Sequence, residues 1–520
     1  MSKPNGNAVA WFIDRHTEAG HGGALVFVDP SRRLTYGGLR AATSRFATAL
    51  RALGVGAERR VALVMLDTVD FPIAFWGAMR AGAIPVPVNT LLTPEQTGYV
   101  LSDSRAEALV VSAPLLDALR PVLRDTPHLR HVIVAAIDGG APSVREGEVA
   151  LPVLLASGRA DMAPVPASED EPGVWFYSSG STGLPKGVRH VHGSLRATAE
   201  TYGAQVLGIQ ADDVVFSAAK LFFAYGLGNA MTFPMSVGAA AVLLPDRPTP
   251  DAVLATMRRF QPTIFGGVPT LYAALLAHPK LGRGAGSARL RRCISAGEAL
   301  PEQIGQRWEA TVGTEILDGL GSTEMLHIFL SNRPGAVRYG TTGLPVPGYT
   351  LRIIDPTGAE VAEGEMGELI VSGPSAAEGY WNQRDKTRRT FRGEWVHTGD
   401  TYTRVDGYYR YCGRADDMMK VGGIWVSPFE VEEALIAHPA VQEAAVVGHA
   451  DADGLVKPKA FVVLRPDQSA DSAETLAEAL KAHVQARIGV WKYPRWVEVV
   501  ESLPKTATGK VQRYRLRDAP

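Results

Sequence analysis

Short apolar runs alternate with amphipathic stretches along the first third of the chain. The run Val61–Leu66 is continuous and flanked by charged residues, which is typical of a buried strand, and Ile84–Val88 is a second strand-like run. Between them, from Val69 to Met79, apolar residues recur at helical spacing. Further strand-like and helical stretches follow at 109–112, 115–124 and 132–137. Strands that alternate with helices indicate crossover units, so we predict an α/β fold with a largely parallel sheet.

The pattern loosens at residues 138–172, which are rich in Gly, Ala, Pro and Ser and predict a surface connection. A smaller α+β pattern follows Arg414. Ser427, Pro428 and Glu430 stand in the order of a capping box, which predicts a helix that ends near His438. Beyond it the pattern predicts strands at 441–447, 460–464 and 496–500 and a helix at 474–487. We expect a large body, residues 1–415, and a small lid domain, residues 416–520.

Length and charge narrow the class of protein. The 520 residues exceed the roughly 250–300 at which one hydrophobic core stops growing, which agrees with two domains. With 53 Lys and Arg against 54 Asp and Glu, the net charge of −1 argues against a nucleic-acid clamp. The apolar runs fall well short of the roughly 18 residues of a transmembrane helix, and the N-terminal run 8–13 is too short for a signal-peptide core. We therefore expect neither a membrane segment nor a secretion signal.

The two cysteines, Cys293 and Cys412, lie far apart in the chain and form no CxxC pair. That spacing disfavours both a disulfide framework and a zinc cluster. A reducing, cytoplasmic setting fits best. The chain also holds 54 Gly and 35 Pro, so the places where glycine permits a close backbone approach are the features to locate.

The densest run of small residues is Tyr177–Gly187, which reads Tyr-Ser-Ser-Gly-Ser-Thr-Gly-Leu-Pro-Lys-Gly. Backbone amides freed by glycine, several hydroxyls and the ammonium of Lys186 are what a polyphosphate needs. The Walker A pattern is absent, because Gly187 rather than Ser or Thr follows the lysine. A flexible surface loop is the alternative, which the fixed order of the residues disfavours.

This run resembles the phosphate loop of the adenylate-forming superfamily, which comprises acyl- and aryl-CoA synthetases, peptide-synthetase adenylation domains and luciferases. Further stretches match the motifs of that superfamily, in its order, along essentially the whole chain: Ser295–Glu298, Gly321–Glu324, Thr398–Asp400, Gly413–Asp417 and Pro504–Lys510. Six ordered motifs are far more specific than one. Within the superfamily, Lys220–Asn229 and Glu324–Phe329 resemble the benzoate-CoA ligase group.

The resemblance implies a body with mixed and parallel sheets, a small mobile lid, and a two-step ligation that uses ATP, Mg²⁺ and coenzyme A. A carboxylate would first form a mixed anhydride with AMP and release pyrophosphate, and a thiol would then displace AMP. The implied catalytic residues are Thr182, Lys186, Glu324 and Lys510, with Glu324 also the Mg²⁺ ligand. Lys510 would bridge the carboxylate and the α-phosphate. For the basic run 505–517 around it, a solvated tail is the alternative.

The resemblance assigns further residues to ATP and AMP: Ser181, Gly183, Ala296, Gly297, Glu298, Asp318, Gly319, Leu320, Ser322, Thr323, Asp400 and Arg414. Asp400 would accept hydrogen bonds from both ribose hydroxyls, since an ionised carboxylate offers only acceptors. Considered alone, Asp400 would be interpreted as a turn residue. Many relatives have Tyr where this chain has Leu320, so the adenine would lose an aromatic face.

The lid would rotate between the two steps, because coenzyme A must reach the carbonyl carbon that Lys510 had covered. The hinge and coenzyme A residues implied by the resemblance are Asp416, Lys420, Val421, Gly422, Gly423, Trp491 and Lys492. A few residues that absorb large φ/ψ changes are the usual hinge pattern. Glycine would let the backbone pass close to the pantetheine arm.

The resemblance also places an aryl-acid pocket at Phe223, Ala224, Tyr225, Gly226, Ala296, Gly321, His327 and Ile328. Small residues would open a flat slot, aromatic rings would face the acid, and Ile328 would close one end. That set suits benzoate or a hydroxybenzoate, as in aromatic degradation, better than a fatty acid. Tyr225 and His327 could instead be core residues with local hydrogen bonds, so benzoate and its hydroxy isomers are not separated.

Other functions stay open. An adenylation enzyme could load an aryl acid onto a carrier protein, although the chain ends soon after Lys510, which favours free coenzyme A. A ligase for another small cyclic acid is a second alternative. A noncatalytic nucleotide sensor would not need Lys186, Glu324, Asp400 and Lys510 together. Lys510 is also a candidate target for a lysine acetyltransferase, because acetylation removes the charge. A dimer is compatible with the sequence.

Overall fold

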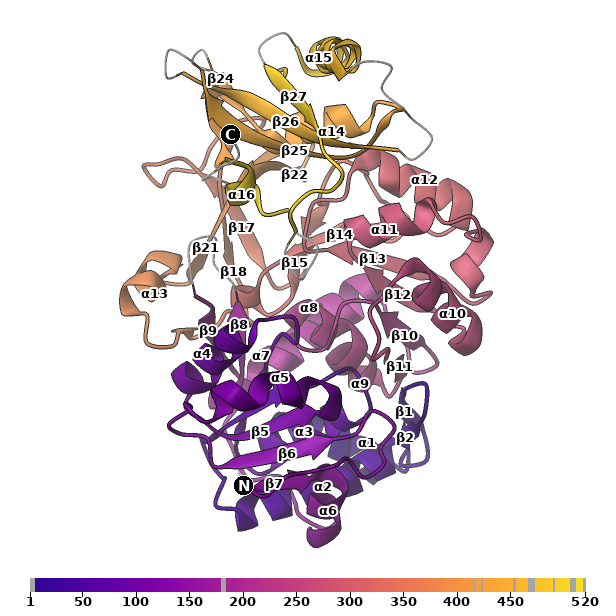
Figure 1. Ribbon diagram of the computed structural model, residues 1–520, viewed down its shortest axis with the longest axis vertical. Helices are drawn as coiled ribbons and strands as arrows, with labels where there is room; N and C mark the ends of the chain where they lie inside the picture. The colour runs from indigo at the N-terminus through magenta and orange to yellow at the C-terminus, as the bar shows by residue number, and fades with distance from the viewer. Residues whose placement is uncertain are drawn as a thin grey trace.

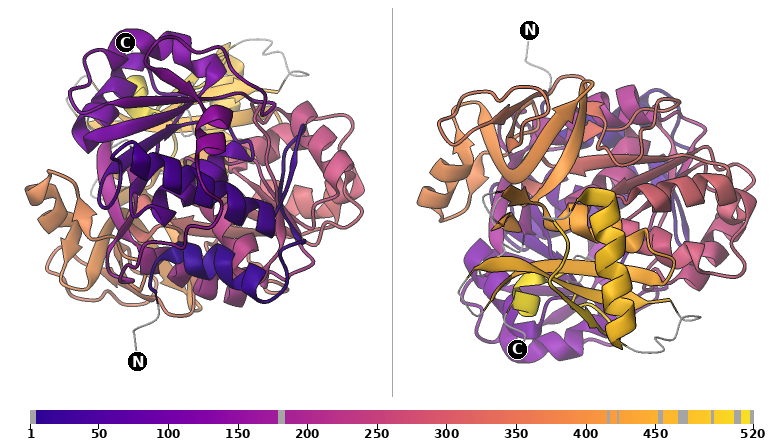
Figure 2. Two further views of the ribbon diagram at one scale, coloured as in Figure 1. Left: turned by 90° about the horizontal axis from the view of Figure 1, so that it is seen from below. Right: turned by 90° about the horizontal axis from the view of Figure 1, so that it is seen from above.

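The computed structural model describes residues 5–178, 184–414, 417–421, 424–451, 455–465, 473–489, 492–505 and 511–517. The molecule is elongated, with the lid at one end and the parallel sheet formed by residues 60–150 near the other (Figure 1). Seen from above, the lid lies over part of the body (Figure 2). No helix in the described ranges is both long and apolar enough to cross a membrane.

The largest described sheet lies in the middle of the molecule (Figure 1). In spatial order its strands are β16 (Leu344–Pro345), β15 (Ile328–Ser331), β14 (Ile316–Gly321), β13 (Arg292–Ala296), β12 (Ile264–Gly267), β10 (Val214–Ser217), β11 (Ala240–Val242), β1 (Leu25–Val28) and β2 (Arg33–Thr35). The strands from β14 to β1 pair in parallel, and antiparallel strands close both edges. The carboxyl ends of β10, β12, β13 and β14 therefore meet at one edge, where ligands bind in open α/β sheets.

A second sheet is parallel throughout and contains the first predicted crossover units. Its strands are, in order, β4 (Ile84–Pro87), β3 (Arg60–Val64), β5 (Ala106–Ser112), β6 (His131–Ala135) and β7 (Glu148–Ala150). The α/β prediction is confirmed here, with strand and helix ends shifted by one to three residues. The prediction for 138–172 is wrong in part, because β7 and the helix α6 (Leu151–Ser157) form within it. Both are short, and α6 buries only Leu151 and Leu154, so the pattern there is too brief to detect.

Two antiparallel sheets complete the body. One joins β8 (Pro172–Ser178), β9 (Lys186–Val191) and β19 (Gly379–Tyr380), which brings together segments almost two hundred positions apart. The other consists of β17 (Thr350–Ile354), β18 (Gly367–Ser372), β20 (Phe391–Arg392), β21 (Trp395–Val405) and β22 (Tyr408–Arg414). The strand β22 leads directly toward the lid.

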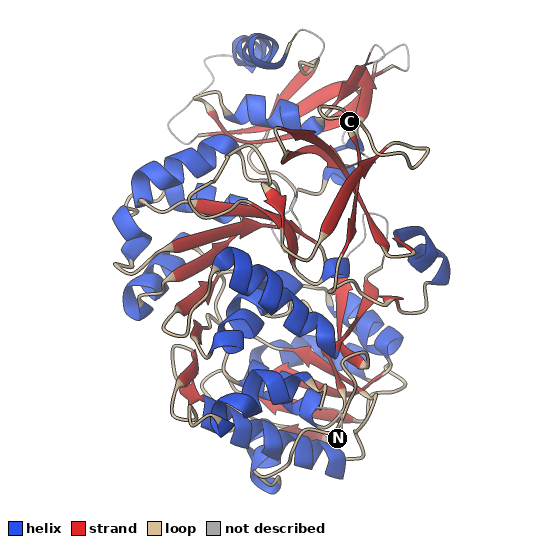
Figure 3. Cartoon of the chain, turned by 180° about the vertical axis from the view of Figure 1, so that it is seen from behind, coloured by secondary structure: helices blue, strands red, loops and turns tan. Residues whose placement is uncertain are grey.

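Helices cover the sheets of the body (Figure 3). They are α1 (Arg15–Glu18), α2 (Tyr36–Ala52), α3 (Asp70–Arg80), α4 (Pro94–Ser104), α5 (Ala113–Leu123), α7 (His192–Thr198), α8 (Ala224–Leu227), α9 (Phe233–Val237), α10 (Pro250–Phe260), α11 (Pro269–Leu276), α12 (Glu302–Val312) and α13 (Arg384–Thr390). Thr35, Thr93 and Thr249 cap α2, α4 and α10, since each hydroxyl accepts the N–H three residues on. One face of the large sheet packs against α10, α11 and α12, around Trp308, Phe265 and Leu275.

The lid has a hydrophobic cluster of its own, which includes Val431, Leu435, Val446, Val462 and Leu480. Its elements are β23 (Met419–Val421), β24 (Ile424–Val426), α14 (Pro428–Ile436), β25 (Val441–Ala450), β26 (Val456–Leu464), α15 (Ala473–Ile488), β27 (Trp496–Val499) and α16 (Arg513–Arg517). The predicted strands and helices of this region are confirmed, although β25 and β26 are longer than expected. The domain boundary at 415/416 stays a prediction.

The start of α14 differs in one detail from a full capping box. Ser427 Oγ accepts the Glu430 N–H at 3.1 Å, as predicted. The Glu430 carboxylate instead accepts two hydrogen bonds from Lys492 Nζ, at 2.7 and 2.8 Å. Half of the capping box is therefore replaced by an ion pair that ties α14 to the segment before β27.

Candidate active site

Three polar side chains form the phosphate corner, the name used below for Lys186, Glu324 and Tyr380. Lys186 Nζ donates to Glu324 Oε1 and to the Tyr380 hydroxyl, both at 2.8 Å, and Tyr380 Oη donates to Glu324 Oε1 at 2.7 Å. Burial raises the pKa of Glu324, but the Lys186 charge and the hydrogen bonds from Lys186 and Tyr380 outweigh it, so the pKa is lowered overall. Burial and the Glu324 charge raise the pKa of Tyr380. The corner thus holds an ionised carboxylate against a lysine.

The fold brings these three residues together from distant parts of the chain. Lys186 is the first residue of β9, which pairs with β19 and so faces Tyr380. Glu324 lies in the 3-10 turn Thr323–Met325 that follows β14, and Ser322 caps that turn by accepting the Met325 N–H at 3.2 Å. His190 Nε2 donates to the Thr323 carbonyl at 2.7 Å, which fastens the turn to β9. Burial lowers the pKa of His190 to about 4, so this histidine is neutral.

Asp400 and Arg414 lie opposite each other on β21 and β22. Arg414 Nη1 donates to Asp400 Oδ1 and to the Thr398 carbonyl, both at 3.1 Å. Gly399, which lies between Thr398 and Asp400 in the chain, has φ +70°, a backbone conformation that favours glycine. The structure therefore brings the two predicted nucleotide residues together beside the hinge segment; their ribose role stays a prediction.

The predicted adenine segments also lie side by side. Strands β13 and β14 are parallel neighbours, with Ala296 opposite Gly319 and Ser295 opposite Asp318. Gly297 follows β13 with φ +97°, so a turn conformation rather than crowding requires glycine there. Asp318 Oδ1 is buried and makes no hydrogen bond to any described residue, and burial raises the pKa of this carboxyl well above its usual range. A buried oxygen without a partner costs free energy, so it suits a ligand such as an adenine amino group.

The predicted aryl segments converge at the same edge of the large sheet. The Tyr225 hydroxyl donates to the Gly267 carbonyl at 3.0 Å and to the Ile294 carbonyl at 3.2 Å, so these two carbonyls share its one proton. His327 Nε2 donates to the Tyr225 carbonyl at 3.2 Å, and burial lowers the pKa of His327 to about 3. His327 Nδ1 is consequently an acceptor, and it is buried without a partner in the described structure. The local hydrogen-bond interpretation thus holds for Tyr225, while His327 keeps one free acceptor.

Two glycines of the predicted slot have another structural reason. A Cβ at Gly226 would lie 2.1 Å from the Lys220 carbonyl oxygen, and a Cβ at Gly321 would lie 2.7 Å from the His327 carbonyl oxygen. Backbone crowding therefore demands glycine at both positions, whatever space they leave for a substrate. Phe223 and Ala224 are half-buried at the start of α8, and Ile328 is buried at the start of β15.

Two residues outside the predicted set belong to this region. Tyr380 completes the phosphate corner, but only the pairing of β9 with β19 reveals it. Asn229, within the short helix Gly228–Thr232, is fully buried and lies next to the Tyr225 hydroxyl. Its place in the matched stretch 220–229 was the only indication in the sequence.

The predicted coenzyme A and hinge residues are described only in part. Lys492 pairs with Glu430 at 2.7 Å, and Val421 is buried in β23. Residues Ser181, Thr182, Gly183, Asp416, Gly422, Gly423, Trp491 and Lys510, together with the Lys420 side chain, lie outside the described parts of the structure.

Three described residues of the basic run 505–517 form ion pairs within the lid. Lys505 pairs with Glu443 at 2.7 Å, Arg513 pairs with Glu432 at 2.7 Å, and Arg517 pairs with Asp417. Glu432 is 5% exposed, so its pair with Arg513 is buried. For these residues, a solvated basic tail is the wrong interpretation.

A narrow cavity lies between the lid and the body near Asp318. Its lining is Ala299, Leu300, Asp318, Gly340, Thr341, Thr342, Tyr411, Phe429 and Glu433. Burial raises the pKa of Glu433 to about 7; Arg410, at 3.6 Å, opposes the shift and Glu302 adds to it. In this arrangement the lid thus presents a carboxyl group that binds a proton near neutral pH.

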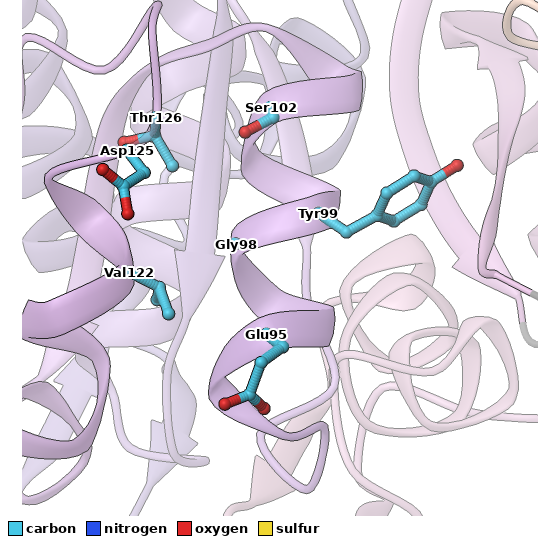
Figure 4. A pocket seen from close by; sticks show the side chains of 7 residues that line it. All are labelled: Glu95, Gly98, Tyr99, Ser102, Val122, Asp125 and Thr126. Atoms are coloured by element: carbon cyan, nitrogen blue, oxygen red, sulfur yellow. The ribbon is translucent and has the colours of Figure 1, made fainter.

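A larger hollow of about 300 Å³ lies elsewhere, between α4 and the end of α5 (Figure 4). Glu95 and Asp125 line it, and no lysine or arginine does. Tyr99 points to the other side of α4 (Figure 4). An acidic, open hollow of this kind does not suit a polyphosphate or an aryl carboxylate.

Comparisons with known proteins agree with the geometry. The AMP-binding enzyme family matches residues 14–381, and the AMP-binding enzyme C-terminal domain matches residues 430–510. The chain is 53% identical to a 4-hydroxybenzoate–CoA/benzoate–CoA ligase of Rhodopseudomonas palustris, over 98% of this chain and 94% of that protein. Among solved structures it is similar to a benzoate CoA ligase from Burkholderia xenovorans LB400, with 48% identity, a TM-score of 0.90 and coverage of 99% and 100%. It is also similar to an anthranilate CoA ligase in complex with anthranoyl-AMP, with 40% identity, a TM-score of 0.92 and coverage of 98% and 96%.

Proposed function

The chain belongs to the AMP-binding enzyme family of adenylate-forming enzymes, and we propose that it is an ATP-dependent aryl-CoA ligase. It converts benzoate or a hydroxybenzoate to the CoA thioester through an aryl-adenylate, with release of AMP and pyrophosphate. The observation that carries the proposal is the turn after β14. That turn places Glu324 of the phosphate corner and His327 of the aryl slot three residues apart, at the carboxyl edge of the large sheet.

In the first step, the aryl carboxylate attacks the α-phosphorus of ATP, and pyrophosphate leaves. Negative charge crowds at this centre, so oriented cations lower the barrier. Lys186 sits where the phosphate loop enters β9 and would bind the β- and γ-phosphates, together with Ser181, Thr182 and Gly183. Lys510 would bridge the carboxylate and the α-phosphate. Asp318 would accept from the adenine, and Asp400 with Arg414 would hold the ribose.

Adenylate-forming CoA ligases use ATP, Mg²⁺ and coenzyme A. The residues present fit a magnesium ion, because Glu324 is ionised and both of its strong hydrogen bonds fall on Oε1. Magnesium is usually held by one or two carboxylates plus phosphate oxygens and water. The described residues contain no group of three His, Cys, Asp or Glu that could hold a metal alone. When bound, the ion would neutralise phosphate charge.

In the second step, the thiol of coenzyme A attacks the carbonyl carbon of the adenylate, and AMP leaves with the electron pair. The lid would rotate at Asp416, within a boundary at 415/416, to withdraw Lys510 and present Lys420–Gly423 to the pantetheine arm. Trp491 and Lys492 would lie near the CoA nucleotide. Because Lys492 is already paired with Glu430, any contact with CoA would have to compete with that ion pair.

The substrate test compares acids in the presence of Mg²⁺, ATP and free coenzyme A. We expect AMP and thioester from benzoate and from at least one hydroxybenzoate, and far slower turnover of cyclohexanecarboxylate, whose ring is not flat. His327 Nδ1 is the free acceptor that a ring hydroxyl could satisfy, so the rates for benzoate and its hydroxy isomers test whether the acid reaches this atom. AMP release without thioester until a carrier protein is added would refute free coenzyme A as the acceptor.

Three finer assignments rest on the sequence. A lysine acetyltransferase acting on Lys510 would silence the first step, and full activity in protein shown by intact mass to be acetylated there would refute it. A dimer is the assembly to test by light scattering. A reducing cytoplasmic setting follows from the cysteine pattern, and both cysteines are buried and free.

A further inference from the structure

The helix α13 (Arg384–Thr390) carries a lysine that the sequence motifs do not include. Its charged residues are Arg384, Asp385, Lys386, Arg388 and Arg389. Lys386 is half-buried, whereas the other four are exposed. A lysine that turns inward while its neighbours face water needs a reason, because a cation loses hydration when it is buried.

The helix is held tightly against the phosphate corner. The Tyr380 N–H donates to Thr387 Oγ1 at 3.0 Å, and the Thr390 hydroxyl lies 3.4 Å from the Tyr380 hydroxyl. A Cβ at Gly379 would lie 2.6 Å from Thr387 Cγ2, so only glycine allows this close approach. Thr387 and Thr390 thus fix which face of α13 is turned toward Tyr380.

Lys386 lies on that same face. It precedes Thr390 by four residues, and residues four apart are neighbours on a helix surface. The charges of Lys186 and Glu324 also act on Lys386. Burial lowers the pKa of Lys386 most, the positive charge of Lys186 lowers it further, and the Glu324 carboxylate raises it. Lys386 therefore lies on the side of α13 that packs against Tyr380 of the corner.

The charge balance of this region is therefore positive. Lys186 and Glu324 neutralise each other at 2.8 Å, and Lys386 makes no hydrogen bond or ion pair with any residue that the structure describes. The geometry points to Lys386 as a second polyphosphate-binding lysine, which contacts the terminal phosphates of ATP and the pyrophosphate formed from them. This assignment rests on the proposed function.

The role fits the chemistry of the first step. An oxygen of the aryl carboxylate forms a bond to the α-phosphorus while the bond from that phosphorus to the bridging oxygen breaks. Pyrophosphate leaves with the electron pair, so negative charge grows on the phosphates that Lys386 contacts, and no proton has to move. A cation at this position stabilises the leaving group, and in the reverse reaction it binds pyrophosphate.

The test compares Lys386→Gln, which removes the charge, with Lys386→Arg, which keeps it, and with Arg388→Gln on the exposed side of α13. Affinity for inorganic pyrophosphate in the presence of Mg²⁺ is measured by calorimetry on the full chain. The KM for pyrophosphate is then measured in ATP synthesis from synthetic benzoyl-adenylate. We expect Lys386→Gln to weaken both about tenfold, as loss of one charge-assisted hydrogen bond does. Lys386→Arg and Arg388→Gln should stay near wild type.

Thioester formation from benzoyl-adenylate and coenzyme A uses no pyrophosphate, so Lys386→Gln should leave it unchanged, which separates a binding role from damage to the fold. Equal pyrophosphate affinity in wild type and Lys386→Gln would overturn the assignment, as would an equal loss in Arg388→Gln or an equal loss in the thioester step. The calorimetric result needs no aryl acid. A wild-type chain that binds pyrophosphate through Lys386 but activates no aryl acid would refute the proposed function and leave this assignment standing.

Discussion

The phosphate corner of the body and the basic run of the lid carry similar charges and use them differently. In the corner, Lys186 and Glu324 meet at the edge where four parallel strands end, and β14, one of these strands, carries a buried polar atom that lacks a described partner, Asp318 Oδ1. In the lid, Lys505, Arg513 and Arg517 are paired with carboxylates of the lid itself. A run of positive charge in a sequence is thus largely structural here, whereas a site is marked by charge that converges on unsatisfied groups.

The charged residues of the two regions therefore have different roles. The described basic residues of the lid hold its parts together, and breaking the buried Arg513–Glu432 pair would leave an uncompensated charge. These basic residues are therefore poor candidates for catalytic residues. Lys510, which lies outside the described residues, is the member of the run that the superfamily motif assigns to the first step.

The largest expected effect is that of Lys510→Ala. We predict that adenylate formation falls about 10³-fold, the scale on which loss of one charge at a transition state is felt. Thioester formation from preformed benzoyl-adenylate should be nearly unaffected, because that step has no need of the lysine. The control is Lys505→Ala, which removes a lysine paired with Glu443. A parallel loss of both half-reactions in Lys510→Ala would break the division between body and lid.

The hinge variant Asp416→Pro should act in the opposite way. Proline fixes φ, so a residue that must change conformation between the two steps is locked. We predict that adenylate formation is spared and that thioester formation falls about a hundredfold, measured as single-turnover rates of each step. Equal losses in the two steps would place the hinge elsewhere.

A smaller effect is expected from Tyr380→Phe in the body. The change deletes one hydrogen bond to the Glu324 carboxylate, and a bond to a charged group contributes about 1.5–3 kcal/mol, so adenylate formation should slow at least about tenfold. The matched control is Tyr339→Phe. The Tyr339 hydroxyl also donates to a carboxylate, that of Glu309 at 3.0 Å, but this pair is not part of the corner. If both variants slowed adenylation equally, the corner would have no special role.

The smallest effect concerns the interface between the two regions. Glu433 has its pKa raised from 4.5 to about 7, chiefly by burial. Its contribution to docking of the lid is complete below pH 4.5 and is lost as pH rises toward 7, by at most about 1.4 kcal/mol per pH unit. Glu433→Gln mimics the protonated carboxyl, so it should match wild type in melting temperature near pH 5 and exceed it near pH 8. A difference that does not grow with pH would exclude this titration.

The sequence predicts local features well and long-range pairings poorly. The strand–helix alternation of 61–88 and the Ser427 cap follow from periods and caps within one short window. Tyr380 and Lys386 could not be found in that way, because they reach Lys186 only through the pairing of β9 with β19, far apart in the chain. Likewise, Glu430 forms an ion pair with Lys492 in place of half its capping box, a choice that only the tertiary structure determines.

The glycines show the same limit. The motif predicted that Gly226 and Gly321 open a slot for the acid. The structure shows backbone oxygens of Lys220 and His327 where their Cβ atoms would lie. A motif identifies which positions require glycine, but only packing shows what each glycine makes room for.

The central claim is that this chain makes an aryl-adenylate before it uses coenzyme A. The most direct measurement is a rapid-quench experiment in which the wild-type enzyme, benzoate and Mg-ATP are mixed without coenzyme A. We predict benzoyl-adenylate and pyrophosphate in equal amounts, close to one per enzyme, followed by conversion of the adenylate to benzoyl-CoA and AMP when coenzyme A is added. Formation of ADP and phosphate, or an adenylate that free coenzyme A does not discharge, would contradict the account.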